Sequence, residues 1–288
     1  MAKGRKKQVD LTTEKKVQKL DSKFFFESIS EGLEKTIYDP EDIWEEYPVD
    51  MEEFILSKKY LNLKGTVFPK NLETLVELDK RDENFFPKYR IIILIMGKGS
   101  GKSFMSSCLF AREIYLDLCK KNPHKFYKLS QDDPIYFINL ARNERQAKNV
   151  VFAQFIAKIQ NSPWFQGKFR KTALEIEFPK SIHAMCGHSQ AEAWLGYNTK
   201  VGILDELAWY MDSENRDNSK QCWEAIEGSC MTRFGHFYRQ IGITSPRYEG
   251  DFAMRKLEEA KTLSYGFGLQ LPTWDVNPKT PFEYFKDK

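Results

Sequence analysis

The sequence predicts an α/β fold in which a mostly parallel central sheet is covered by helices on both faces. Five apolar runs are predicted to be buried strands, over 91–96, 135–140, 200–206, 237–244 and 265–271, and helical segments separate them. Such alternation is typical of parallel sheets, because a crossover helix returns the chain to the edge from which the next strand starts. A glycine-rich turn follows the first run directly and leads into another helical segment.

Composition and charge narrow the class of protein. The chain has 288 residues, of which 41% are hydrophobic and 14% aromatic, enough for a sizeable core. Its net charge of +3 does not by itself indicate nucleic-acid binding. No apolar run approaches the roughly 20 residues that span a bilayer, and the charged N-terminus has no apolar stretch behind it. We therefore expect a soluble intracellular protein that makes no contact with a membrane.

The chain is predicted to have four parts. Residues 1–23 are polar and rich in lysine, which is typical of a flexible basic tail, with contact to DNA or a partner as the alternative. Residues 24–84 mix aromatic and acidic side chains and predict a small N-terminal helical and extended appendage. Residues 85–272 show no break in composition and are predicted to form one core domain. Residues 273–288 then begin a linker.

The remaining elements of the core follow from local patterns. The stretches 174–178 and 181–186 are separated by Pro179-Lys180 and predict a small hairpin. Apolar residues at helical spacing predict the helices that alternate with the strands. These helices are expected over 72–78, 104–119, 147–159, 220–229 and 250–262.

The first strand runs into Gly97-Lys98-Gly99-Ser100-Gly101-Lys102-Ser103, a phosphate-binding turn of the P-loop type. Backbone N–H groups in such a turn, and the helix N-terminus behind it, bind anions. The pattern assigns Lys102 to the β- and γ-phosphates and Ser103 to Mg²⁺. The general motif has glycine where Met96 stands, so this is a variant with an extra cation at Lys98, placed to act on the transition state. The predicted cofactors are ATP and Mg²⁺.

The strand over 200–206 ends in two acids, Asp205 and Glu206. An aspartate at a strand end binds Mg²⁺ opposite the P-loop hydroxyl, and the adjacent glutamate can act as the base that polarises the attacking water. Acid pairs are often merely solvated, but this pair follows an apolar strand about 100 residues beyond the P-loop. The strand over 135–140 intervenes between the two motifs. This order predicts the additional-strand, catalytic-glutamate (ASCE) class of P-loop NTPase.

Three further side chains are candidates for catalysis. Thr244 ends the fourth predicted strand and can sense the γ-phosphate beside the P-loop, the alternative being a simple strand end before Pro246. Arg142 and Arg145 follow the second strand, and either can reach a neighbouring subunit as an arginine finger. The alternative for both arginines is the solvated start of the following helix.

These motifs together resemble the large terminase subunits, the DNA-packaging motors of tailed bacteriophages and herpesviruses. The basic P-loop carries the resemblance, with Gly196-Tyr197-Asn198, Thr244-Ser245-Pro246, the segment 142–152 and the closing stretch 272–278. The similarity covers residues 60–280.

The resemblance implies the N-terminal ATPase domain of a motor that drives double-stranded DNA into a procapsid. It implies a homo-oligomeric ring on the portal protein, a monomer in isolation, a small terminase subunit as partner, and the cytoplasm of the infected bacterium as location. By position, Thr244-Ser245 matches the motif that couples hydrolysis to movement. The adenine pocket of the family comes from the segment before the P-loop, here 60–69, which makes Tyr60 a candidate.

Large terminases usually continue into an RNase H-like nuclease, whereas this chain stops ten residues after Pro278. We therefore expect the motor domain without nuclease activity. One alternative is another P-loop DNA translocase or helicase-type ATPase, which would need further motifs and usually a second sheet domain. The other is a nucleotide-dependent assembly switch, against which Glu206 argues, because a switch does not need an efficient hydrolytic base.

Overall fold

The computed structural model describes residues 40–142, 151–172, 175–188, 194, 196–211, 214 and 216–286. The chain divides into two compact units, Met1–Asp42 and Ile43–Lys288. Only 40–42 of the first unit are described, at the start of the short helix α2 (Pro40–Ile43). The predicted basic tail 1–23 and Arg145 lie outside the described residues. The other elements belong to the second unit.

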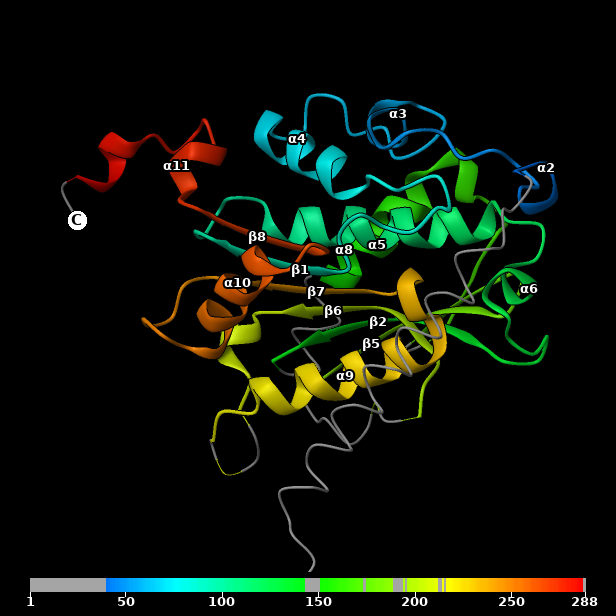
Figure 1. The fold of residues 1–288 in the computed structure, drawn as a ribbon. Coiled ribbons are helices and arrows are strands. Elements are labelled where there is room, and N and C mark those ends of the chain that lie inside the picture. Colours follow the sequence, from blue (N-terminus) through cyan, green and yellow to red (C-terminus); the bar gives the residue numbers. More distant parts are fainter. Residues whose placement is uncertain are drawn as a thin grey trace, which may run out of the picture. The chain divides into compact units, whose positions relative to one another are not determined.

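An eight-stranded sheet forms the centre of the second unit (Figure 1). Its strands are β1 (Ile91–Met96), β2 (Ile135–Ala141), β3 (Arg170–Lys171), β4 (Glu175–Phe178), β5 (Ile182–His188), β6 (Thr199–Asp205), β7 (Arg239–Thr244) and β8 (Gly266–Leu271). Their order is β3-β4-β5-β2-β6-β7-β1-β8. All pairings from β5 to β8 are parallel, and the β3-β4-β5 edge is antiparallel. The mostly parallel sheet and the antiparallel hairpin are confirmed.

The strand that separates the P-loop strand from the acid-pair strand is β7, so assigning that position to 135–140 was wrong. β7 pairs with β1 through Ile243 and Leu94, and with β6 through Ile243 and Asp205. β2 lies on the far side of β6. The long helix after β1 carries the chain past two strand positions that β6 and β7 fill later. An additional strand does separate the two motif strands, but it is β7, which follows β1, β2 and β6 in the chain.

Helices cover both faces of the sheet (Figure 1). They are α3 (Met51–Leu56), α4 (Pro69–Leu78), α5 (Lys102–Leu118), α6 (Pro123–Tyr127), α8 (Val151–Asn161), α9 (Ser219–Phe234), α10 (Phe252–Thr262) and α11 (Thr273–Val276). On one face α5 contacts β6, β7 and α8, with α3 and α4 packed over it. On the other face α9 covers β6 and β7, and α10 covers β1 and β8. No helix within the described ranges is long and apolar enough to cross a membrane.

The core sits where β1 meets α5. All six residues of β1 are buried, as expected for a central strand covered on both faces. Helix α5 is buried on almost every side, because the sheet, α8, α3 and α4 surround it. It begins at Lys102, two residues before the predicted start, after Gly101 in the left-handed conformation (φ 88°).

Helix α5 buries two acids that pair with cations from other elements. Glu113 lies 3.0 Å from Arg239 of β7 and 3.5 Å from Lys200 of β6, and it also contacts Arg81. Asp117 lies 2.9 Å from Lys200. Burial alone would raise the pKa of Glu113, but the three cations hold it well below its usual value. This buried ion network ties α5 to β6, to β7 and to the segment after α4.

We predict that Glu113→Gln lowers the free energy of unfolding by about 3–5 kcal/mol, because it leaves buried cations without their counter-charge. Denaturant titration followed by circular dichroism measures the change. Glu258→Gln is the matched control, since Glu258 forms an exposed ion pair with Lys261 on α10. Its effect should stay within about 0.5 kcal/mol. Equal stability of the two variants would contradict a stabilising role for the network.

Candidate functional site

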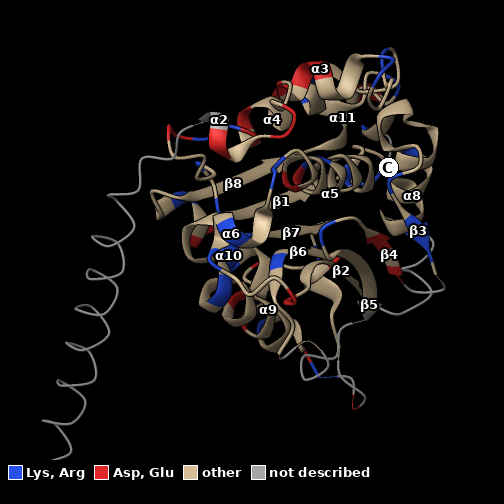
Figure 2. Ribbon diagram, turned by 90° about the vertical axis from the view of Figure 1, so that its right-hand side faces the viewer, with Lys and Arg blue, Asp and Glu red and all other residues tan. Residues whose placement is uncertain are grey.

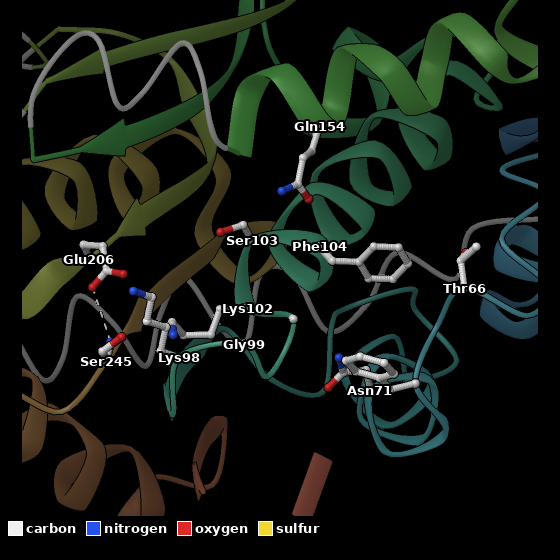
Figure 3. Close-up of a pocket in the computed structure, with 12 residues that line it drawn as sticks. Thr66, Asn71, Lys98, Gly99, Lys102, Ser103, Phe104, Gln154, Glu206 and Ser245 are labelled. Carbon is white, nitrogen blue, oxygen red and sulfur yellow. Dashed lines mark hydrogen bonds between the residues drawn. The ribbon is translucent and has the colours of Figure 1, made fainter. Parts of the chain in front are cut away.

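A cavity of about 520 Å³ lies at the carboxyl edge of the sheet (Figure 3). β1, β6 and β7 are parallel neighbours, so their carboxyl ends meet at this edge. They bring the P-loop, the acid pair and the Thr244-Ser245 turn to one place. The volume is in the range of small-molecule sites.

The two ends of the cavity differ in chemistry (Figure 3). One end gathers Lys98, Lys102, Glu206 and Ser245. The other end has uncharged side chains, those of Thr66, Asn71 and Phe104, and Ser103 and Gln154 lie between the two ends. Phe68 also lines the cavity and lies near Asn71, since a methyl group on Gly101 would contact both.

The Lys102 ammonium group is buried against its own loop. Its Nζ donates to the carbonyl oxygens of Met96 at 3.0 Å and Gly97 at 3.1 Å. Burial lowers the pKa of Lys102, and the charges of Glu206 and Asp205 oppose that shift. An ammonium group held by two neutral carbonyls in a desolvated site can exchange them for the charged oxygens of a phosphate.

Asp205 and Glu206 occupy different environments although they are adjacent. Asp205 ends β6 and is 2% exposed. Burial, and then the charge of Glu206, raise the pKa of Asp205 to about 7, while Lys102 opposes the rise. Glu206 leaves the strand with a left-handed backbone (φ 57°), which costs a non-glycine residue on the order of 1–3 kcal/mol. At this bend the Glu206 carboxylate faces the charged end of the cavity (Figure 3).

The turn after β7 holds the Glu206 carboxylate. The Ser245 N–H donates to Glu206 Oε2 at 3.3 Å. The Thr244 hydroxyl lies 3.4 Å from the same oxygen and 3.0 Å from the Ser245 carbonyl, and either of these can accept its single proton. Arg247 fixes the segment after Glu206, since its Nη1 donates to the Ala208 carbonyl at 2.9 Å. Thr244 is 1% exposed and does not itself line the cavity, so its predicted role in sensing the γ-phosphate remains a prediction.

Ser103 and Asp205 fit a magnesium ion. They supply a hydroxyl and a carboxylate, and Mg²⁺ prefers such hard oxygen ligands alongside phosphate oxygens. Ser103 lines the cavity from the first turn of α5, and Asp205 ends the strand that leads into it. A carboxylate whose pKa is raised by burial is stabilised in its charged form by a nearby cation.

Five of the seven P-loop residues assigned to the nucleotide line the cavity, whereas Gly97 and Ser100 do not. Ser100 is fully buried, and its hydroxyl donates to the Gly97 carbonyl at 2.7 Å. Gly97 packs against Thr273. These two residues support the loop from behind, and a direct contact of either with nucleotide remains a prediction.

Tyr60 is not part of the cavity. It is 2% exposed, and its ring packs against Phe54 and Tyr115 with centroid distances of 5.9 and 5.6 Å. Its aromatic ring is therefore buried in the core, next to α3 and α5, and is not available to a nucleotide base. The segment predicted to approach the cavity does so, but through Thr66 and Phe68.

Arg142, one of the two candidate arginine fingers, is not among the described residues that line the cavity. Arg142 is exposed and directly follows β2, on the carboxyl edge of the sheet. Arg145 lies outside the described residues. A role for either in a neighbouring subunit remains a prediction.

Three residues that line the cavity belong to no recognisable sequence motif, so the sequence did not predict them as site residues. Asn71, in the first turn of α4, donates from Nδ2 to the Ser100 carbonyl at 2.9 Å and is 1% exposed. Phe104 stands two positions after the P-loop lysine, where a helical pattern only indicates burial. Gln154 comes from α8, and no spacing relates it to the P-loop.

The strand, glycine-rich turn and helix, with an acid pair on a parallel strand two positions away, define a P-loop domain. A family model described as "Uncharacterized protein MJ0330, N-terminal P-loop domain" matches residues 23–288, and the chain belongs to this family. Uncharacterized protein MJ0330 of Methanocaldococcus jannaschii is 28% identical over 232 residues. The match covers 75% of this chain and 40% of that protein, so the chain spans less than half the length of this relative.

Two solved structures show the same fold. The large terminase of bacteriophage HK97 aligns with 77% of this chain and 43% of its own at a TM-score of 0.54 and 14% identity. The ATPase domain of the Thermus phage P74-26 large terminase aligns with 77% of this chain and 92% of its own at a TM-score of 0.51 and 14% identity. The fold is thus that of phage large terminase ATPase domains, which confirms the predicted P-loop fold.

We predict that Gly97→Ala destabilises the protein by about 1–3 kcal/mol, because the new methyl group meets the Thr273 hydroxyl and lies 2.9 Å from its backbone nitrogen. Gly228→Ala is the control, since a methyl group on that residue of α9 meets nothing within 4 Å. It should raise stability by about 0.5–1 kcal/mol through helix propensity. Denaturant titrations give both values, and an unchanged Gly97→Ala midpoint would contradict the tight fit behind the P-loop.

Proposed function

We propose that this chain binds ATP with Mg²⁺ and hydrolyses it. The observation that carries the proposal is the placement of Lys102 and Glu206 at one end of a cavity built on a P-loop, with the Asp205 carboxylate buried close enough to influence both charges. A phosphate-binding loop alone would serve a binding protein equally well. A glutamate carboxylate that faces the same cavity, held in place by a neighbouring turn, is what hydrolysis requires in addition.

The two ends of the cavity indicate how ATP lies. The lysines at the charged end suit the β- and γ-phosphates, and the N-terminus of α5 adds its dipole. Phe68 and Phe104 at the other end offer ring surfaces for the base. Ser103 lies between the two ends, where its hydroxyl would be close to the phosphates and their Mg²⁺.

The chemistry divides among the chain's own residues. Ser103 and Asp205 would hold Mg²⁺, which when bound neutralises phosphate charge. Glu206 orients the attacking water and accepts its proton at a carboxylate oxygen. Lys102 and Lys98 stabilise the negative charge that develops on the transferred phosphoryl group. The Thr244-Ser245 turn holds Glu206 in the orientation that this role requires.

We further propose that hydrolysis drives movement of double-stranded DNA, as the resemblance to large terminases implies. The contact between Glu206 and the turn after β7 supports this, because a change at the γ-phosphate would reach the segment that leads to α10. The proposal includes a homo-oligomeric ring, a portal protein and a small terminase subunit as partners, in the host cytoplasm. Arg142 or Arg145 would act in the neighbouring subunit's site.

DNA contacts in such a motor would be made mainly to phosphates and would weaken with salt. Basic segments are spread over several elements, α10 and β3 among them, and acidic segments lie on α3 and α4 (Figure 2). With a net charge of +3, a DNA-binding surface must be a local patch rather than the whole molecule.

We predict that Glu206→Gln retains ATP binding but loses turnover by about 10²–10⁴-fold, because the amide cannot accept the proton of the attacking water. Lys102→Ala should instead weaken ATP binding. Calorimetry measures binding, and phosphate release measures turnover. Glu258→Gln on exposed α10 is the control and should match the unmodified chain. Turnover of Glu206→Gln within a few-fold of the unmodified chain would remove Glu206 as the base.

A mixing experiment tests the arginine in trans. Arg142→Ala subunits and Glu206→Gln subunits should each be nearly inactive, and a mixture should recover part of the activity. An intact arginine can then serve an intact glutamate across the subunit interface. Phosphate release is measured at constant total protein over a range of mixing ratios. Activity that never exceeds the sum of the two variants would argue against Arg142 as the finger.

A further inference from the structure

Three consecutive carbonyl groups of the P-loop each accept a hydrogen bond from a side chain outside the loop. Thr273 Oγ1 donates to the Lys98 carbonyl, Asn277 Nδ2 to the Gly99 carbonyl, and Asn71 Nδ2 to the Ser100 carbonyl, each at 2.9 Å. Thr273 and Asn277 belong to the segment that follows β8, and Asn71 belongs to α4. We call these three side chains the P-loop bracket.

The bracket is one packed unit. Helix α11, which begins at Thr273, contacts α4. The Asn277 N–H donates to the Thr273 carbonyl at 2.8 Å, which sets the two donors of this segment relative to each other. A methyl group on Gly101 would lie 2.5 Å from Asn71 Nδ2, so the bracket touches the loop closely.

The direction of these hydrogen bonds has a consequence for anion binding. The carbonyl and the N–H of a peptide unit point in opposite directions, so a carbonyl held on one side of the loop turns the following N–H to the other side. Phosphate needs N–H groups facing it and no carbonyl oxygens nearby. Outside donors on the Lys98 and Ser100 carbonyls therefore favour the anion-binding orientation of the Gly99 and Gly101 N–H groups. The donor on the Gly99 carbonyl instead supports the turn inside the loop, in which the Ser100 N–H donates to the Gly97 carbonyl at 3.3 Å.

We propose that Thr273 and Asn277 are positioning residues for the nucleotide phosphates, acting with Asn71 through the P-loop backbone. The proposal rests on the proposed function, because it assigns these residues to the same ATP site. None of the spacing rules for P-loops predicts them, since Thr273 and Asn277 lie 175 and 178 positions after their partners. By linkage, the position of the segment 273–277 and the affinity of the P-loop for nucleotide depend on each other.

Four variants of the chain test the bracket. Thr273→Val removes the hydroxyl and keeps the branched shape, whereas Thr273→Ser keeps the hydroxyl. Asn277→Ala removes the second donor at a half-buried position, together with the side-chain oxygen that accepts from the Lys279 N–H at 3.0 Å. Thr262→Val is the matched control, because it removes an exposed hydroxyl that donates to the Glu259 carbonyl within α10, away from the P-loop.

The first measurement is amide hydrogen exchange of residues 97–103 without nucleotide. In Thr273→Val and Asn277→Ala, the amides of Gly97 and Ser100 should exchange about fivefold faster, because their N–H groups donate to the Leu271 and Gly97 carbonyls and depend on an ordered loop. Thr273→Ser and Thr262→Val should exchange like the unmodified chain. Unchanged exchange in both Thr273→Val and Asn277→Ala would overturn the bracket, whether or not the chain binds nucleotide.

The second measurement is the Kd for ADP by calorimetry, with KM and kcat for ATP. Thr273→Val and Asn277→Ala should each raise Kd and KM about fivefold with little change in kcat, and Thr273→Ser should restore both. Faster exchange with an unchanged Kd would overturn the positioning role. If the unmodified chain bound neither ADP nor ATP, the proposed function and this role would both fail, while the exchange result would still decide whether the bracket orders the loop.

Discussion

The buried ion network around Glu113 and Asp117 is the constraint on which the rest of the structure depends. Helix α5 is enclosed by the sheet and by α3, α4 and α8, so its two acids cannot reach water and must be neutralised inside. Their partners come from β6, β7 and the segment after α4. The same pairing that makes these charges tolerable also fixes the register of α5 against the sheet. Since α5 begins at Lys102, the network sets where the phosphate-binding turn lies.

The site follows from that placement and from the parallel sheet. Neighbouring parallel strands have their carboxyl ends at the same edge of the sheet. The P-loop, the acid pair and the turn after β7 therefore meet because of the strand pairing alone. Burial then separates the acids: Asp205 is enclosed and has a raised pKa, while Glu206 is held by hydrogen bonds at the cavity. The P-loop is also held by hydrogen bonds from α4 and from the segment after β8, which reach its carbonyl groups.

Sequence patterns predicted the strands, the P-loop and the acid pair because each depends on neighbours in the chain. Buried strands need continuous apolar runs, and a phosphate-binding turn needs its glycines and lysine together. The order of the strands in the sheet could not be predicted in this way. β2 precedes β6 and β7 in the chain, yet both of those strands lie between β2 and β1, and no local sequence pattern indicates such a crossover. Tyr60 was a candidate for the adenine pocket but lies in the core, because the sequence pattern of an aromatic residue is the same in either place. Thr273 and Asn277 were unpredictable as partners of the P-loop, since their contacts exist only once β8 pairs with β1.

We propose a metal-dependent hydrolytic site at the carboxyl ends of β1, β6 and β7. Steady-state release of phosphate from ATP, measured in Mg²⁺ and again in excess chelator, tests this proposal, with Asp205→Asn run beside the unmodified chain. We expect release that requires the metal and is lost in Asp205→Asn, because the buried carboxylate would be the protein's charged ligand for the ion. Release that continues at the same rate in chelator or in Asp205→Asn would contradict it, as would a complete absence of Mg²⁺-dependent release from the unmodified chain.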